Sequence, residues 1–325
     1  MAQLINTALS TRALSVGYHK GNVQVPILEN LELSLIAGEL VCFMGPNGIG
    51  KSTLIRTLAG LQRPLSGNIY HKNDKDLPRQ ISVVLTDRIA ATNLSAYELI
   101  AIGRYPYLNW TIKLNEEDKR IIDVAVEQTN IKHLLAKKLY ELSDGQLQMV
   151  MIARALAQDG GIILLDEPTA HLDLNNRVEI MNLLRKLSRT TNKAILVATH
   201  ELDLALQTAD LIWLAGKNKT ILTGMPEDLV LNGSFDEVFQ FKGFDLRTGK
   251  IQHEPHRGIS VNVIGTGPEL LWTKNALERN GFNIEDNAKT TIHVLNEGGC
   301  YSWVLAKDGA TISLPSLSAV INSVQ

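Results

Sequence analysis

The chain has 325 residues, of which 45% are hydrophobic and 20% are charged, and its formal net charge is −2. This length and composition are typical of a globular protein with room for two domains. The near-neutral charge and the dispersed basic residues argue against a nucleic-acid partner.

The N-terminal segment 1–7 has no basic run followed by a long apolar core, and no stretch of the chain approaches about 18 consecutive apolar residues. We therefore expect a chain that neither spans nor crosses a membrane. The two cysteines, Cys42 and Cys300, lie far apart in the sequence and show no metal-site spacing. They are predicted to be reduced thiols of a cytosolic protein.

A glycine-rich segment joins a predicted strand to a predicted helix. Residues 45–53, G-P-N-G-I-G-K-S-T, fit the pattern G-x-x-x-x-G-K-[ST]. The apolar run 39–44 before them is typical of a buried strand, and residues 51–59 have helical spacing. The loop amides and the positive end of the helix dipole favour an anion, here a polyphosphate. The candidate phosphate-binding residues are Gly45, Pro46, Asn47, Gly48, Ile49, Gly50, Lys51, Ser52 and Thr53.

Three side chains of this loop have expected roles. Lys51 is predicted to reach the β- and γ-phosphates, Ser52 to offer its hydroxyl to Mg²⁺, and Thr53 to lie close behind. The alternative is an ordinary strand-to-helix turn with an exposed lysine, for which the complete pattern would be a coincidence.

A second short motif opens a predicted helix. Residues 142–146 are L-S-D-G-Q, and apolar positions recur after them at helical spacing as far as Leu156. Ser143 or Asp144 can cap this helix. A plain helix cap is the alternative interpretation of the motif.

Two further apolar strands end in polar side chains. Residues 161–168, G-I-I-L-L-D-E-P, end in two acids, and the strand at 194–199 is followed by His200. The carboxyl ends of parallel strands meet at the ligand-binding edge of an α/β sheet. Asp166 is therefore a candidate Mg²⁺ ligand, Glu167 a candidate base that polarises water, and His200 a candidate γ-phosphate contact. Surface caps and a structural histidine are the alternatives.

Taken together, the motifs resemble those of the ATP-binding cassette (ABC) ATPases, and L-S-D-G-Q resembles the signature motif of that family. The resemblance covers about residues 5 to 243. It implies an ATP-hydrolysing homodimer in which Ser143 and Gly145 of one chain meet the γ-phosphate of ATP bound to the other.

Two smaller motifs carry the same resemblance. Tyr18, in S-V-G-Y, matches the aromatic residue that stacks on adenine; an ordinary strand aromatic is the alternative. Residues 170–173, A-H-L-D, match the loop after the catalytic acid, which implies that Asp173 acts across the dimer. A polar turn at a helix start is the alternative there.

The implied fold is an α/β P-loop NTPase with an ABC ATPase core at residues 1–244. A β-rich lobe and the P-loop strand and helix would occupy residues 1 to about 85, and a helical subdomain with the signature about 87–158. The catalytic strands would return at 161–223, with a helix at 174–187.

Within the family, the chain is more similar to the importer ATPases for iron–siderophore complexes, haem and cobalamin. The segment 103–110, G-R-Y-P-Y-L-N-W, the helix 116–128 and the stretch 151–158 carry this likeness, although a packed loop is an alternative for the first. It implies ATP and Mg²⁺ as cofactors and integral membrane permease subunits as partners, with a periplasmic or surface substrate-binding protein involved indirectly. The location would be peripheral, at the cytoplasmic face of the inner cell membrane.

Two other functions remain open. One is a soluble ABC ATPase that acts on ribosomes, DNA or cluster assembly. The other is a regulatory module that no longer hydrolyses ATP. The presence of Lys51, Asp166, Glu167 and His200 argues against the second of these.

The sequence departs from the family pattern at two places. Thr86 stands where glutamine usually contacts Mg²⁺ or water, so either its hydroxyl binds the metal through water or Asp87 does so, which adds negative charge near phosphates. In the signature, Asp144 replaces a glycine and Leu147 a common arginine. We expect Asp144 to point away and cap the helix.

The sequence changes character after a predicted helix at 226–241. Residues 244–258 resemble a hairpin, and residues 245–258 are predicted to be a linker. His253 and His256 within it have H-x-x-H spacing, but too few further ligands are near for a metal site.

Residues 259–325 are predicted to form a small accessory α+β domain, large enough for its own core. G-T-G at 265–267 fits a weak anion-binding loop or an ordinary turn, and the lack of a lysine favours the turn. Sensing and dimer stabilisation are the roles we consider for this domain. Its expected strands are 259–264, 291–295 and 301–306, and its expected helices are 268–279 and 315–324.

Overall fold

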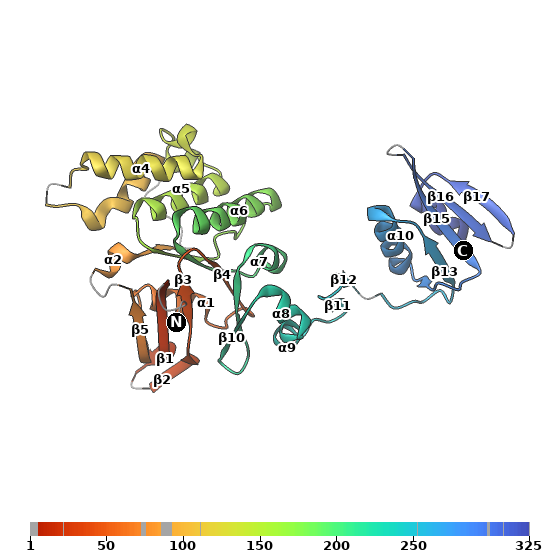
Figure 1. The fold of residues 1–325 in the computed structure, drawn as a ribbon, viewed down its shortest axis with the longest axis horizontal. Helices are drawn as coiled ribbons and strands as arrows, with labels where there is room; N and C mark the ends of the chain where they lie inside the picture. Colours follow the sequence, from red (N-terminus) through yellow and green to blue (C-terminus); the bar gives the residue numbers. More distant parts are fainter. Residues whose placement is uncertain are drawn as a thin grey trace. The chain divides into compact units, whose positions relative to one another are not determined.

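In the computed structural model of the chain, the apolar runs that precede the polar motifs form the parallel strands of one central sheet (Figure 1). Its strand order is β10-β9-β4-β8-β7-β6. All residues of β4, β7 and β8 are buried, as expected for strands that are covered on both faces. The strands are β4 (Leu40–Met44), β6 (Ile81–Val84), β7 (Ile162–Asp166), β8 (Ala194–Ala198), β9 (Leu211–Ala215) and the antiparallel edge strand β10 (Ile221–Gly224).

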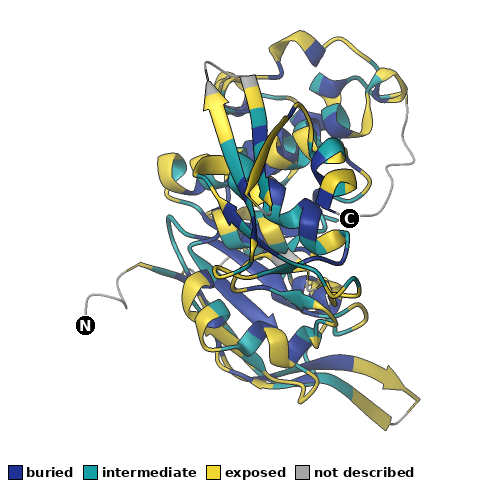
Figure 2. Ribbon diagram, turned by 90° about the vertical axis from the view of Figure 1, so that its right-hand side faces the viewer, coloured by how far each residue is buried: buried dark blue, intermediate teal, exposed yellow. Residues whose placement is uncertain are grey.

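The structure describes residues 6–21, 23–72, 76–85, 93–110, 112–251, 253–297, 300–307 and 309–324. By internal contacts the chain divides into two units, Met1–Gln240 and Phe241–Gln325. Burial follows the strands, and Figure 2 shows buried residues concentrated in the central sheet and exposed residues on the outer helix faces and loops. Across the described parts of the chain, no helix combines the length and apolar character that crossing a membrane requires.

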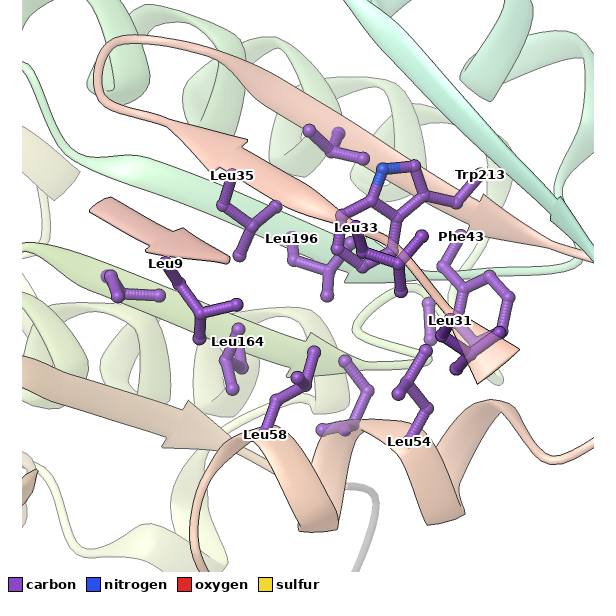
Figure 3. Close-up of a cluster of buried hydrophobic side chains, with 14 of the residues drawn as sticks. Leu9, Leu31, Leu33, Leu35, Phe43, Leu54, Leu58, Leu164, Leu196 and Trp213 are labelled. Atoms are coloured by element: carbon purple, nitrogen blue, oxygen red, sulfur yellow. The ribbon is translucent and has the colours of Figure 1, made fainter. Parts of the chain in front are cut away.

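An antiparallel lobe at the start of the chain packs against the central sheet. Its strands are β1 (Thr7–Lys20), β2 (Val23–Leu31), β3 (Ser34–Ile36) and β5 (Ser66–His71). Figure 3 shows leucines of this lobe, strand residues of the central sheet and two leucines of α1 (Lys51–Leu58) in one buried cluster. Within it, the rings of Phe43 and Trp213 meet edge to face with centroids 6.4 Å apart. This packing fixes the strand and the helix on either side of the glycine-rich loop.

The helical region of the first unit is held by a buried ion pair. Arg104 Nε lies 2.9 Å from Asp118 Oδ1, and Arg104 also donates to the Ala157 carbonyl at 3.0 Å. Of the segment 103–110, residues 103–107 belong to a 3-10 helix, whereas Trp110 lies beyond its end and is fully exposed. The elements of this region are α3 (Ala96–Ala101), η2 (Ile102–Tyr107), α4 (Glu116–Thr129), η3 (Lys132–Leu134), η4 (Leu139–Glu141) and α5 (Asp144–Ala157).

Among the remaining helices of this unit, one prediction is wrong. The predicted helix 226–241 is two short helices, because Gly233 adopts a left-handed conformation with φ 81° between them. The helix predicted at 174–187 extends to Thr191, where Asn192 ends it in a left-handed conformation. The helices are α2 (Leu77–Gln80), α6 (Leu174–Thr191), α7 (Leu202–Thr208), α8 (Pro226–Leu231) and α9 (Ser234–Phe239).

The second unit has its own sheet and core. Its sheet has the order β14-β13-β15-β16-β17, and α10 and α11 contact it. Trp303 is buried in this core, and its indole N–H donates to Thr273 Oγ1 at 2.8 Å. The elements are the hairpin β11 (Phe244–Asp245) and β12 (Lys250–Ile251), followed by β13 (Ser260–Ile264), α10 (Gly267–Arg279), β14 (Asn283–Ile284), β15 (Thr290–Glu297), β16 (Cys300–Lys307), β17 (Ala310–Leu314) and α11 (Leu317–Val324).

Two of these strands escaped the sequence prediction. β14 has only two residues, too few to show a periodic pattern. β17 does alternate, as A-T-I-S-L, but it is a short edge strand in which only Leu314 is buried, and the prediction passed over it. The segment 265–267 leads into α10, which begins at Gly267 and whose first turn holds the acidic Glu269. A carboxylate there disfavours a second anion.

A chain that ends at Phe244 is expected to fold, because among the described residues the buried apolar cluster of the first unit contains none from the second. Thermal unfolding followed by circular dichroism would measure this, together with ATP binding. A matched variant that ends at Leu231 removes the buried Phe235 and Val238 and should be clearly less stable. An insoluble protein from the longer truncation would mean that the second unit belongs to the core of the first.

Candidate functional site

The loop between β4 and α1 has a backbone that only glycine adopts readily. Gly45, Gly48 and Gly50 have φ of 154°, 79° and 106°. A Cβ at Gly50 would lie 2.6 Å from Ile27 Cγ2, and one at Gly45 would lie 2.9 Å from the Ala215 carbonyl oxygen. No side chain caps α1, and its first turn holds no acid. The first N–H groups of α1 are therefore suited to an anion.

Lys51 is the cation of this site. Its side chain is nearly buried, and Nζ donates to the Gly45 carbonyl at 3.0 Å and lies 3.9 Å from Glu167 Oε1. Burial lowers the pKa of the Lys51 ammonium, and the carboxylates of Glu167 and Asp166 oppose that shift. The structure thus brings the predicted lysine beside the predicted acid.

The next two loop residues face different surroundings. Ser52 is exposed at the start of α1, whereas Thr53 is buried and its Oγ1 lies 2.8 Å from the hydroxyl of Tyr18. This bond holds the ring of Tyr18 beside the loop, with the residue still 53% exposed. An exposed aromatic face at this place can stack on a base.

Glu167 and His200 form a pair at the edge of the central sheet. Glu167 follows β7 with φ 50°, and its N–H donates to the Ala198 carbonyl of β8 at 2.8 Å. His200 Nδ1 lies 2.5 Å from Glu167 Oε2. Asp166, the last residue of β7, is buried next to them. The sheet register therefore gathers the predicted acids, histidine and lysine at one edge, as the sequence predicted.

The signature residues lie at the start of α5 and play a local role there. Ser143 is the N-cap, accepting from Gln146 N–H at 3.3 Å, and Gln146 accepts in return from Ser143 N–H. Asp144 does not cap the helix as expected but occupies its first turn, where a carboxylate complements the dipole. Gly145 is buried, and a Cβ there would lie 2.9 Å from the side chain of Asn176.

Asp173 caps α6 in a similar way, because its Oδ1 accepts from Asn176 N–H at 2.9 Å. Within the described residues, Ser143 and Asp173 make no hydrogen bond or ion pair to Lys51, Glu167 or His200. The predicted residues thus form two groups in one chain, one around the glycine-rich loop and one at the starts of α5 and α6.

The structure does not describe every residue that the sequence singles out. Thr86 and Asp87 lie outside the described residues. Burial raises the pKa of the Cys42 thiol to about 12, so it stays protonated, as expected for an inert thiol. The burial of Cys300 is also outside what the structure describes.

Sequence reasoning missed two charged residues beside the site. Arg177 of α6 and Glu201 after His200 form an ion pair at 2.7 Å. A lone arginine in the first turns of a helix resembles any surface arginine, so no signal in the sequence distinguished it. The acid directly after His200 was the better clue.

The donor set fits a magnesium nucleotide. The loop amides and Lys51 suit phosphate oxygens, and the Ser52 hydroxyl and Asp166 carboxylate are the hard oxygen donors that Mg²⁺ prefers.

Comparisons with known proteins agree with this geometry. A family model described as ABC transporter matches residues 28–170, and one described as Iron ABC transporter C-terminal domain matches residues 258–325. An uncharacterized ABC transporter ATP-binding protein of Methanocaldococcus jannaschii is 38% identical over 277 residues, covering 81% of this chain and 94% of that protein. The iron(3+)-hydroxamate import ATP-binding protein FhuC of Bacillus subtilis is 34% identical, covering 75% of this chain and 93% of that protein.

Solved structures give the same match. An inward-facing ABC transporter provisionally assigned to the metal-chelate type superposes with a TM-score of 0.65 at 28% identity, covering 72% of this chain and 90% of that one. A dimeric bacterial ABC transporter cassette superposes with a TM-score of 0.56 at 29% identity, covering 67% of this chain and 98% of that one.

Proposed function

This chain belongs to the family of ABC transporter ATP-binding proteins, and we propose that it drives import of an iron–siderophore complex, haem or cobalamin. It is the ATPase subunit of an ABC importer, which binds ATP and couples ATP hydrolysis to transport. The substrate class rests on the match of residues 258–325 to the iron ABC transporter C-terminal domain. The hydroxamate import role in the name of the Bacillus subtilis relative supports the same class.

We assign the hydrolytic roles to the group at the sheet edge. Lys51 and the amides of residues 45–53 hold the phosphates, and Tyr18 stacks on adenine. Glu167 accepts a hydrogen bond from the attacking water, and His200, held by Glu167, contacts the γ-phosphate.

The metal site we propose uses the oxygen donors of Ser52 and Asp166, with Thr86 as a further ligand through water. A Mg²⁺ ion held there would offset charge on the β- and γ-phosphates. The polar ends of α1 and β7 are where the sheet fold offers these donors.

We propose a homodimer in which the second group of residues serves the partner's ATP. Ser143 and Gly145 would meet the γ-phosphate held by the partner, and Asp173 would act across the interface. Their separation from Lys51 and Glu167 within one chain supports this arrangement. The dimeric form of the cassette relative supports it as well.

The proposed partners are integral membrane permease subunits at the cytoplasmic face of the inner membrane, with a periplasmic or surface binding protein acting indirectly. We propose the division 1–244 for the ATPase domain, 245–258 for a linker and 259–325 for an accessory domain. Separate apolar cores in the two units support that division.

A tagged chain is expected to co-purify from detergent-solubilised membranes with a polytopic protein. Cells lacking the chain should then take up less radiolabelled iron–siderophore, haem or cobalamin, and a plasmid copy should restore uptake while a Lys51→Ala copy should not. Recovery of the chain with ribosomes or DNA instead would favour the soluble ABC ATPase alternative.

Glu167→Gln should keep ATP binding and lower hydrolysis by about 10²- to 10⁴-fold, because the amide keeps the shape but loses the acceptor charge. ATP binding and phosphate release by the purified chain would be measured side by side. Glu179→Gln is a matched control, since Glu179 is exposed on α6 and should not affect turnover. Turnover of the first variant near the wild-type rate would remove Glu167 from the assignment.

A mixture of Lys51→Ala chains with Ser143→Arg chains should regain partial ATPase activity. A heterodimer of the two has one doubly damaged site and one intact site, whereas each homodimer has damage in both. Activity would be measured against the mixing ratio, with heterodimers confirmed by differential tags. Heterodimers without ATPase activity would contradict a shared site, provided that a control dimer with one competent site is active.

A further inference from the structure

We propose that Arg177 is a positioning residue for ATP hydrolysis, which joins the loop 170–173 to the side chain of Glu201 and thereby places Glu201 beside His200. This inference rests on the proposed roles of Glu167 and His200. Arg177 and Glu201 are 24 positions apart in the sequence, and the fold brings their side chains together.

The guanidinium of Arg177 bridges two segments at once. Nε donates to the Leu172 carbonyl at 2.6 Å, and Nη1 donates to Glu201 Oε1 at 2.7 Å. The side chains of Arg177 and Glu201 are 33% and 18% exposed, so this pair is better shielded from water than a surface pair. A planar fork with several fixed donors can hold two acceptors in one geometry, which a lysine cannot do.

The carboxylate of Glu201 is not used to cap the helix that follows it. Glu201 precedes α7, and its side chain makes no capping bond there. Its N–H donates to Thr199 Oγ1 at 3.0 Å, which fixes its backbone and leaves the carboxylate to Arg177.

The carboxylate of Glu201 in turn faces the histidine. Its Oε1 lies 3.6 Å from His200 Nε2, while His200 Nδ1 lies 2.5 Å from Glu167 Oε2. The imidazole therefore lies between two acids. Glu167 Oε1 lies 3.9 Å from Lys51 Nζ, so a series of neighbouring polar side chains connects Arg177 to the glycine-rich loop.

This arrangement has an electrostatic consequence for the reaction. His200 Nε2 is the nitrogen left to meet a phosphate, since Nδ1 is engaged by Glu167. A free carboxylate beside it would repel that phosphate and would also be able to draw the imidazole away. Arg177 offsets the charge of Glu201 and restricts its motion, so the histidine keeps one orientation.

The loop contact adds a link to the dimer. Leu172 belongs to the same loop as Asp173, which caps α6 one turn before Arg177. A shift of this loop changes the position of the guanidinium, and the ion pair carries that change to Glu201. Arg177 thus connects a segment proposed to meet the partner with the histidine of its own chain.

The test compares Arg177→Gln with Arg185→Gln in the purified full-length chain. Arg185 lies on the same helix and also ties it to other backbone, donating to the Gln207 and Thr208 carbonyls at 3.1 and 2.9 Å. It lies outside the site, so its loss should affect stability alone. The measurements are kcat and KM for ATP, nucleotide binding, and the midpoint of thermal unfolding.

We expect Arg177→Gln to lower kcat by about 10- to 100-fold, as for a misplaced catalytic group, with ATP affinity and KM nearly unchanged. Arg185→Gln should leave kcat unchanged, and it should lower the midpoint of thermal unfolding about as much as Arg177→Gln does. Arg177→Lys should recover part of the loss, since it restores the charge but not the fork.

The double variant Arg177→Gln/Glu201→Gln separates this proposal from a merely structural role. If Arg177 acts through Glu201, the double variant should be no slower than the slower single variant. Losses that multiply, or a kcat for Arg177→Gln equal to that of Arg185→Gln, would overturn the proposal. If Arg177→Gln does not fold, the same comparison with Arg177→Lys and Glu201→Gln decides it.

Glu167→Gln shows which hypothesis has failed. An inactive Glu167→Gln with a normal Arg177→Gln rejects the role of Arg177 alone. An active Glu167→Gln rejects the assignment of the site itself, whatever Arg177 does.

Discussion

The polar groups of this site can emerge at only one place, because the central sheet is buried on both faces. β4 and β8 are apolar along their whole length, and β7 is apolar up to its last residue, Asp166. The three strands pair in parallel register, so their carboxyl ends coincide at one edge. A charged residue earlier in any of these strands would be buried without a partner. The pairing of these strands is therefore enough to bring together the glycine-rich loop, the two acids and the histidine.

The same burial makes the charges at that edge depend on one another. Lys51 is nearly enclosed, and its ammonium has the Gly45 carbonyl and the Glu167 carboxylate as partners. A phosphate oxygen can replace either partner without leaving the lysine unpaired, so binding exchanges contacts and does not create a buried charge. Glu167 is also tied to His200, which means that the lysine, the acid and the histidine respond together to whatever occupies the loop.

The sequence predicted most of this edge because each piece is encoded locally. Glycines at 45, 48 and 50, an apolar run before Asp166 and another before His200 are patterns within a few residues. Side-chain bridges between distant segments leave no such pattern, and for this reason the ion pair of Arg177 with Glu201 was missed. The break at Gly233 was missed for a different reason, since apolar spacing continued across it while the backbone did not. The edge strand β17 alternates as A-T-I-S-L over five residues only, and the prediction passed over this short pattern.

Ser143 illustrates why a helix cap can also serve a second chain. As N-cap of α5 its hydroxyl oxygen accepts from the Gln146 N–H at 3.3 Å, and a hydroxyl that accepts in this way keeps its own hydrogen as a donor. An aspartate in the same place could accept but not donate, and its charge would repel a phosphate. The carboxylate that the sequence does supply, Asp144, lies one position later, where it complements the dipole from an exposed place in the first turn. Gly145 completes the arrangement because Asn176 of α6 fills the space that a side chain there would need. The starts of α5 and α6 are thus packed against each other. A shift of Ser143 on contact with a partner's phosphate would therefore also move the start of α6, which carries Asp173 and Arg177.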